Sequence, residues 1–179
     1  MNKKIIICIT IIATFIALCC IVINNSIENK KIKAEKEIID IFNGNKELFA
    51  NVSNELFEFK YHWSLRKEKY DEEIRSDWKS VVLKSGIQLV IQEQDYFNEM
   101  SLMRSAVENN KSIEDVMKKL NFKTITSNSR IDSGCIYFIM QTTPGLSSGI
   151  IYCPNGKPEN SYITKLTAID YSWFYFEEK

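Results

Sequence analysis

The sequence contains few of the residues on which several common classes of protein depend. Its 179 residues include one histidine, three prolines and six glycines, and its 23 basic residues are balanced by 23 acidic ones. A single imidazole argues against zinc sites and Ser-His-Asp catalysis. A chain without excess positive charge lacks the footprint of a nucleic-acid-binding protein, so we expect no nucleic-acid partner. The 45% hydrophobic content excludes disorder over most of the chain.

Motifs for cofactor binding are also missing. The sequence contains no phosphate-binding P-loop, dinucleotide fingerprint or EF-hand. Gly145-Leu146-Ser147-Ser148-Gly149 matches the G-x-S-x-G pattern of α/β-hydrolases, in which the serine lies on a turn between a strand and a helix. Here Ile150 to Tyr152 predicts another strand, and His62 precedes Ser147, whereas the hydrolase histidine follows its serine. We therefore predict no catalytic residue, no metal ligand, no cofactor and no enzymatic activity.

The longest apolar run predicts a membrane anchor. Lys3 and Lys4 precede Ile5 to Ile23, in which the only polar residues are two threonines. Nineteen residues of helix are about 28 Å long, which is enough to cross the hydrocarbon core of a bilayer. Lysines that precede a span favour the cytoplasm. We therefore predict a cytoplasmic tip at residues 1–4, a transmembrane signal anchor at 5–24, and a body outside the cell membrane.

Three other fates of this segment stay open. A cleaved signal peptide would have an apolar core of about 7–15 residues and then a small-x-small site, but the best candidate, Ala17-Leu18-Cys19, lies inside the apolar run. A lipoprotein would carry its lipid on Cys19 or Cys20, each a doubtful acceptor because the bulky Leu18 lies just upstream. The third alternative is a buried helix of a soluble protein. Cysteines 8, 19 and 20 are most simply apolar membrane residues, and the uncleaved anchor is preferred.

The amino-acid usage gives a hypothesis about origin. The chain contains 26 Ile, 19 Lys against 4 Arg, and 15 Asn against 6 Ala. This usage is typical of an AT-rich coding sequence. We therefore interpret the chain as coming from a low-GC bacterium, and the predicted anchor makes it a protein of the bacterial envelope.

After the anchor, the pattern predicts a stalk helix at residues 25–44 and one folded domain at 45–179. Asn43-Gly44-Asn45 has the composition of a turn and should end the stalk. The domain has enough apolar residues for a core of its own, because about 150 residues are well above the size that needs disulfides to fold. The apolar residues of the stalk recur at helical spacing at Ile32, Ile38, Ile39 and Phe42.

The first half of the domain is predicted to be mainly helical. Residues 57–65 alternate strictly between apolar and polar, which favours a strand as much as a continued helix. Residues 87–91 fit a short strand. Asp115 replaces the usual Glu or Gln of a capping box that begins at Ser112. The helical patterns lie at residues 48–57, 66–82 and 96–107, and after Ser112.

The second half predicts an antiparallel meander of four or five strands. Short runs rich in Ile, Tyr, Phe and Thr are separated by turn residues such as Asn155-Gly156. Helices followed by strands make the fold class α+β. The predicted strands are Phe122–Ser127, Cys135–Gln141, Gly149–Cys153, Tyr162–Thr167 and Trp173–Phe176.

A disulfide is the most specific site that the sequence predicts. Cys135 and Cys153 lie in strands on either side of Thr143-Pro144-Gly145. If these three residues form the tip of a hairpin, the two cysteines are directly opposite, at close to disulfide distance. A longer turn would shift this register, and a cysteine in a strand can also be an ordinary buried residue.

The last predicted strand is aromatic on both faces. At the edge of a sheet, Trp173 and Tyr175 would form a recognition surface for a peptide or glycan. In a central strand the same residues would be core, and this second interpretation is favoured.

The sequence therefore predicts a membrane-anchored, extracytoplasmic binding or sensing domain that is not an enzyme. Its partners would be the lipid bilayer, through the N-terminal helix, and another envelope protein. The alternative is a structural subunit of a membrane complex that pairs through the stalk helix. A small serine hydrolase that uses Ser147 is the least favoured hypothesis.

Overall fold

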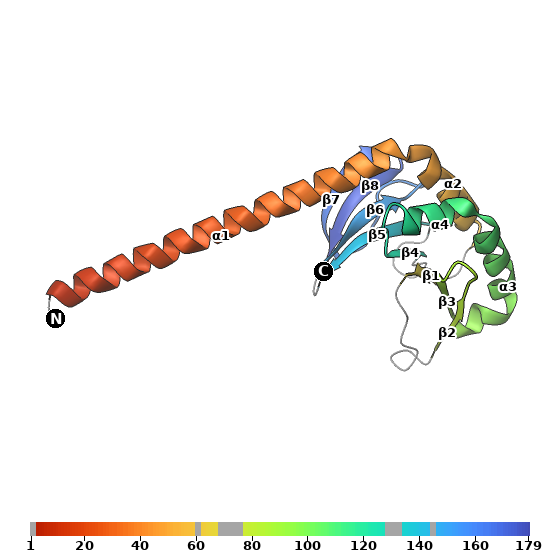
Figure 1. Ribbon diagram of the computed structural model, residues 1–179, viewed down its shortest axis with the longest axis horizontal. Helices are drawn as coiled ribbons and strands as arrows, with labels where there is room; N and C mark the ends of the chain where they lie inside the picture. Colours follow the sequence, from red (N-terminus) through yellow and green to blue (C-terminus); the bar gives the residue numbers. More distant parts are fainter. Residues whose placement is uncertain (1–2, 60–61, 68–76, 128–133, 144–145) are drawn as a thin grey trace. The chain divides into compact units, whose positions relative to one another are not determined.

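The computed structural model describes residues 3–59, 62–67, 77–127, 134–143 and 146–179 (Figure 1). The side chains of residues 3–14, 17, 93–99 and 141–143 lie outside this description. The chain divides into two compact units, residues 1–37 and 38–179.

The first helix, α1, runs from Lys3 to Gly44. Its large apolar side chains from Phe15 to Ile32 are exposed, with exposed fractions from 49% to 67%. These side chains point in several directions around the helix, because successive residues are about 100° apart. This part of α1 therefore presents apolar surface on more than one side.

The end of α1 is fixed by Asn45. Its side-chain Nδ2 donates to the carbonyl oxygen of Ile41 at 2.8 Å, and its backbone N–H donates to the carbonyl of Phe42 at 3.0 Å. These bonds satisfy two of the carbonyl groups that every helix leaves unpaired at its C-terminus. The sequence predicted the end of the helix at this position, and the prediction is confirmed.

The transmembrane helix predicted at residues 5–24 is not found. No helix in the described part of the chain is both long enough and apolar enough to cross a membrane. Described side chains of α1 begin at Phe15, and the apolar run from there to Ile23 is only about 14 Å long, about half of a hydrocarbon core. Charged residues follow from Glu28. The side chains of residues 5–14 lie outside the described ones.

The second unit is built on one antiparallel sheet of eight strands. The strand order is β2-β3-β1-β4-β5-β6-β8-β7, so that β2 and β7 are the edges. The strands are β1 Trp63–Arg66, β2 Trp78–Val82, β3 Gln88–Gln92, β4 Thr124–Ser127, β5 Ile136–Thr143, β6 Leu146–Tyr152, β7 Ile163–Asp170 and β8 Trp173–Glu178.

The main core lies between this sheet and the helices. Helix α2 spans Lys46–Phe57, α3 spans Glu93–Asn109 and α4 spans Lys111–Lys118. Helix α3 contacts β2 and β3, and α2 contacts α4 (Figure 1). Alternate strand residues point into this core, as the pleat of a strand requires. They pack against Phe42, Phe49, Val52, Leu56, Met103, Val116 and Met117 of the helices.

A second, smaller apolar cluster lies on the other face of the sheet. Along β5 and β6, Tyr137 and Ile151 belong to this cluster, whereas their neighbours Phe138 and Ile150 belong to the main core. Strands β5, β6 and β8 are therefore buried on both faces. The small cluster consists of Cys135, Tyr137, Ile151, Cys153, Phe174 and Phe176.

The α+β class, with helices in the N-terminal half and an antiparallel sheet, is confirmed, but the predicted strand number of four to five is wrong. The three additional strands, β1 to β3, come from the half predicted to be mainly helical. The alternating segment at 57–65 divides between the two predicted states, since α2 ends at Phe57 and β1 begins at Trp63.

The helix predicted at residues 66–82 is wrong for its last part. Trp78 to Val82 form β2, which pairs antiparallel with β3 from Trp78 opposite Gln92 to Val82 opposite Gln88. The apolar residues Trp78, Val81 and Val82 are too few to distinguish a helical period from an extended one. Pairing with β3 makes this segment a strand. Residues 68–76 lie outside the described residues.

The predicted meander is also wrong in its last two strands, because β8 lies between β6 and β7. A central position buries both faces of a strand, and β8 has apolar residues on both faces. None of the residues of β7 is fully buried, and β7 carries Lys165, a residue type that protects sheet edges from pairing with other chains. Burial therefore places β8 inside the sheet and β7 at its edge.

The N-cap of α4 is Asn110 and not Ser112. The Asn110 side-chain oxygen accepts from the backbone N–H of Ser112 at 2.9 Å. Asn is as good an N-cap as Ser, so both residues satisfy the sequence rule. The helix therefore begins at Lys111, two residues earlier than a Ser112 cap would allow.

Strands β5 and β6 are joined in an irregular register. Near the turn, Thr143 is opposite Leu146, and further along Ile139 is opposite Gly149, with a register shift at Met140. Gly149 lies at this shift. A Cβ atom added to Gly149 would lie 1.9 Å from the carbonyl oxygen of Phe138.

Substitution of Gly149 by alanine is expected to lower the free energy of unfolding by about 2–3 kcal/mol, because the new methyl group has no space and the clash is with backbone. Thermal unfolding of the purified chain followed by circular dichroism measures the effect. Gly44→Ala is the control, since no atom lies within 4 Å of its added Cβ. Equal stability of the two variants would contradict the register described here.

Candidate binding pocket

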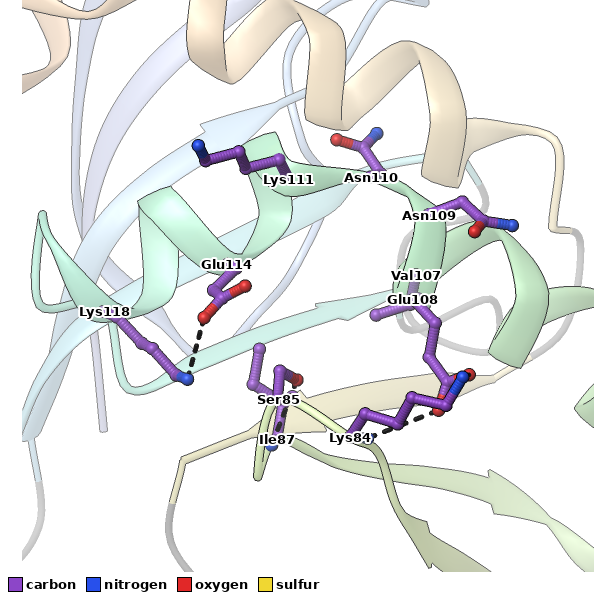
Figure 2. A pocket seen from close by; sticks show the side chains of 10 residues that line it. All are labelled: Lys84, Ser85, Ile87, Val107, Glu108, Asn109, Asn110, Lys111, Glu114 and Lys118. Carbon is purple, nitrogen blue, oxygen red and sulfur yellow. Dashed lines mark hydrogen bonds and ion pairs between the residues drawn. The ribbon is translucent and has the colours of Figure 1, made fainter.

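A polar pocket lies between the β2–β3 turn and the junction of α3 with α4 (Figure 2). Its volume of about 460 Å³ is within the usual range for small-molecule sites. Five of its lining residues are charged. The lining residues are Lys84, Ser85, Ile87, Val107, Glu108, Asn109, Asn110, Lys111, Glu114 and Lys118.

The β2–β3 turn forms one wall of the pocket. The backbone N–H of Gly86 donates to the carbonyl of Leu83 at 2.9 Å, and the Leu83 N–H donates to the carbonyl of Ile87 at 2.8 Å. Gly86 has φ +81°, a left-handed conformation that glycine adopts without strain. The Ser85 hydroxyl accepts from the Ile87 N–H at 3.4 Å. These bonds hold Lys84 beside the end of α3.

Glu108 is the most strongly engaged charged group of the pocket. Its Oε1 accepts from the backbone N–H of Lys84 and from Nε of Arg104, each at 3.3 Å. Desolvation acts to raise the pKa of Glu108, but the Lys84 N–H and the Arg104 guanidinium outweigh it and lower that pKa below its ordinary value. Glu108 is therefore held as a carboxylate.

A second ion pair lies on the opposite side of the pocket. Nζ of Lys118 is 2.9 Å from Oε1 of Glu114, four residues before it on α4. Figure 2 shows this pair on the α4 side and the Lys84–Glu108 pair on the α3 side, with Ser85 and Ile87 between them. The Nζ of Lys84 is 3.8 Å from Oε2 of Glu108. The pocket thus has charges of both signs on two walls.

The cysteines singled out by the sequence are joined in the structure. Cys135 and Cys153 form a disulfide with a Cα–Cα distance of 4.4 Å. Thr143 pairs with Leu146 and is therefore a strand residue, whereas the prediction placed it in a three-residue tip. The shift at Met140 offsets this difference, so that Ile136 is opposite Tyr152, next to the cysteines. Pro144 and Gly145 lie outside the described residues.

Trp173 and Tyr175 do not form the recognition surface considered from the sequence. Tyr175 is 1% exposed and belongs to the main core, against which Trp173 is packed. The ring of Trp173 lies 4.8 Å from that of Phe42. The Tyr175 hydroxyl donates to Oε1 of the buried Glu177 at 2.9 Å. Both residues are core because β8 is a central strand.

Ser147 and His62 are not brought together as a catalytic pair. Ser147 lies within β6, opposite Thr142 on one side and Glu178 on the other, and no helix follows it. The ring of His62 packs edge-on against Trp78, with 4.7 Å between the ring centres. The close approach of Gly149 to β5 gives the last glycine of the G-x-S-x-G match a structural reason. No group of three or more potential metal ligands occurs within the described part of the chain.

Sequence reasoning missed the pocket. Its charged residues come from a hairpin turn, the end of one helix and the face of the next, which are separate segments of the chain. Each segment alone has the charge pattern of a solvated surface. The i, i+4 spacing of Glu114 and Lys118 was the one local signal, and it indicates a helix rather than a pocket.

No protein-family model matches the chain, and no curated protein or solved structure is significantly similar to it. The function is therefore argued from the chain itself.

The disulfide predicts the number of reactive thiols. In denaturant without reductant, three of the five cysteines should react with a thiol reagent, and all five should react after reduction. Because the bond joins residues 18 apart, reduction should lower the free energy of unfolding by about 3 kcal/mol. Five reactive thiols before reduction in protein from the native host would contradict the bond.

The lowered pKa of Glu108 predicts that part of the stability of the protein is lost in acid. A carboxylate whose folded pKa is lowered stabilises the fold above its unfolded pKa, and this stabilisation is lost as the pH falls from the ordinary value of 4.5 through the folded value. Glu108→Gln should therefore lose less thermal stability than the parent between pH 6 and pH 3. Glu55→Gln, which removes an exposed charge of α2, controls for net charge. Identical pH profiles for Glu108→Gln and the parent would contradict the assignment.

Proposed function

We propose that this chain is a membrane-anchored, extracytoplasmic domain of a bacterial envelope protein, and that it binds or senses another envelope component without catalysing a reaction. In this proposal α1 provides the anchor. The second unit provides the recognition, through the pocket between the β2–β3 turn and the α3–α4 junction.

The observation that carries the proposal is the exposed apolar surface of α1. Phe15, Leu18, Val22 and Ile23 are each more than half exposed. A helix that exposes apolar side chains on more than one side needs apolar surroundings, either lipid or protein. The described part of this surface is too short to cross a bilayer, but the sequence continues it to Ile5 without a charged residue.

The orientation of the proposed anchor follows from two further features. Lys3 and Lys4 precede the apolar run, which favours a cytoplasmic N-terminus. The Cys135–Cys153 disulfide favours an oxidising compartment for the body. The bilayer would thus be one partner, and another envelope protein or its ligand would be the second.

A binding role is supported by the chemistry of the pocket. Its carboxylates, Glu108 and Glu114, are both engaged by cations. General acid–base catalysis works best with a group whose pKa lies near the operating pH and that can reach a substrate proton. Glu108 has a lowered pKa and is therefore suited to holding charge in place.

Proteolysis of cells that produce the full chain tests the orientation. A protease that cannot cross the membrane should degrade the body when added to intact cells or, for a host with an outer membrane, to spheroplasts. A cytoplasmic marker protein in the same sample should stay intact. Protection of the body until the cells are lysed would place it in the cytoplasm and overturn the proposal.

The alternative is a structural subunit that pairs through the stalk helix. Ile27 and Ile32 support it, because both are about half exposed on α1. Ile38 cannot take part in the pairing, since it is fully buried in the second unit. A photo-crosslinker at position 32 should capture a partner or a second copy, whereas one at position 30 serves as the control. Absence of any crosslinked species from position 32 would count against the alternative.

A further inference from the structure

The charged groups of the pocket differ in how far the protein itself satisfies them. Oε1 of Glu108 accepts two hydrogen bonds, and its Oε2 faces the Lys84 ammonium. Oε1 of Glu114 accepts from Lys118. The negative charges of the pocket are therefore already compensated.

The ammonium groups and amide N–H donors that line the pocket have fewer close partners. The side chain of Lys111 forms no ion pair or hydrogen bond with other described residues. The side chain of Lys84 is 84% exposed, and its ammonium lies 3.8 Å from Oε2 of Glu108. That distance is longer than a hydrogen bond. The oxygen of Asn110 is occupied by the Ser112 N–H, which leaves its side-chain NH₂ as a donor. Three lysines face two glutamates in the lining.

Apolar residues complete the wall of the pocket. Ile87 and Val107 are buried and contribute to its lining. Ligand pockets typically combine such apolar surface with a few polar groups that fix the orientation of the ligand. The pocket therefore offers apolar contact beside an excess of donors and positive charge.

We propose that this pocket binds a small ligand through an oxyanion, either phosphate or carboxylate, and that Lys84 from the β2–β3 turn and Lys111 from the start of α4 supply the positive charge that attracts it. The inference deepens the proposed binding role and rests on it, but it does not depend on the membrane anchor. Hydrogen bonds between ammonium groups and an oxyanion are charge-assisted, and they are about twice as strong as neutral ones. A cationic ligand would have to displace Lys118 or Lys84 from its carboxylate.

Titration calorimetry of the full chain in detergent tests the ligand class. The probes are inorganic phosphate and succinate, with ethylenediamine as a dication and sodium chloride at equal ionic strength as a control. Phosphate or succinate should bind with a dissociation constant in the millimolar range or below. The anion that binds more tightly shows whether the pocket prefers phosphate or carboxylate. Ethylenediamine should not bind.

Two variants and a matched control locate the site. Lys84→Gln/Lys111→Gln should weaken anion binding by about tenfold or more, because both ammonium groups are removed. Lys157→Gln/Lys179→Gln removes two exposed lysines from elsewhere in the second unit and should bind like the parent. Glu114→Gln should tighten anion binding, since it releases Lys118 and removes a negative charge. A role in folding alone would not produce this gain.

The inference is overturned if neither anion binds, if ethylenediamine binds instead, or if the two double variants bind the anion equally. None of these results would affect the proposed location. Protection of the body from protease in intact cells would overturn the proposed location. It would not change the result for the anion site, which calorimetry measures separately.

Discussion

The packing of aromatic rings around Phe49 is the interaction on which the rest of the second unit depends. Phe49, on α2, has rings on several sides: Phe42 and Phe122 at 5.3 Å, Phe138 at 5.2 Å and Trp173 at 6.1 Å. These residues come from α1, α2, the segment before β4, β5 and β8. Aromatic side chains bury large areas, and their tilted and edge-on contacts add about 0.5–1.5 kcal/mol per pair. One cluster thus joins both ends of the second unit to its middle.

This cluster links the proposed anchor to the proposed binding domain. Phe42 lies in the last turns of α1, so the helix that exposes apolar side chains near Phe15 also supplies core residues to the second unit. The second compact unit begins at Ile38. Ile38 and Phe42 belong to its core, and Ile39 and Ile41 pack against it. A fragment that begins at residue 45 would lose Ile38 and Phe42 from it.

The parts of the fold that depend on local pattern could be predicted from the sequence. The five C-terminal strands were found because runs rich in Ile, Tyr and Thr alternate with turns such as Asn155-Gly156. The end of α1 was found because Asn43-Gly44-Asn45 has the composition of a turn. The disulfide pair was found although the predicted turn was too long, because the shift at Met140 restores the register.

The parts that depend on distant contacts could not be predicted in this way. The sequence of β2 fits a helix as well as a strand, and pairing with β3 makes it a strand. The order of β7 and β8 in the sheet follows from burial, because β8 is buried on both faces. The pocket needs Lys84 and Glu108 to meet across 24 residues of sequence. No local rule relates two such surface charges. Sequence patterns predict most of the helices and strands, whereas the pocket depends on contacts between elements that are distant in the sequence.

The central claim is that the apolar run of α1 anchors the folded unit in a bilayer. Extraction of membranes with alkaline carbonate tests this claim most directly. Full-length chain from its native membranes should stay in the pellet. A variant with Ile11→Lys and Ile12→Lys should move to the supernatant, because each charge at the centre of a span costs about 2.5–3.5 kcal/mol. Ile32→Lys, beyond the run, should stay in the pellet. Release of the unaltered chain into the supernatant would contradict the anchor.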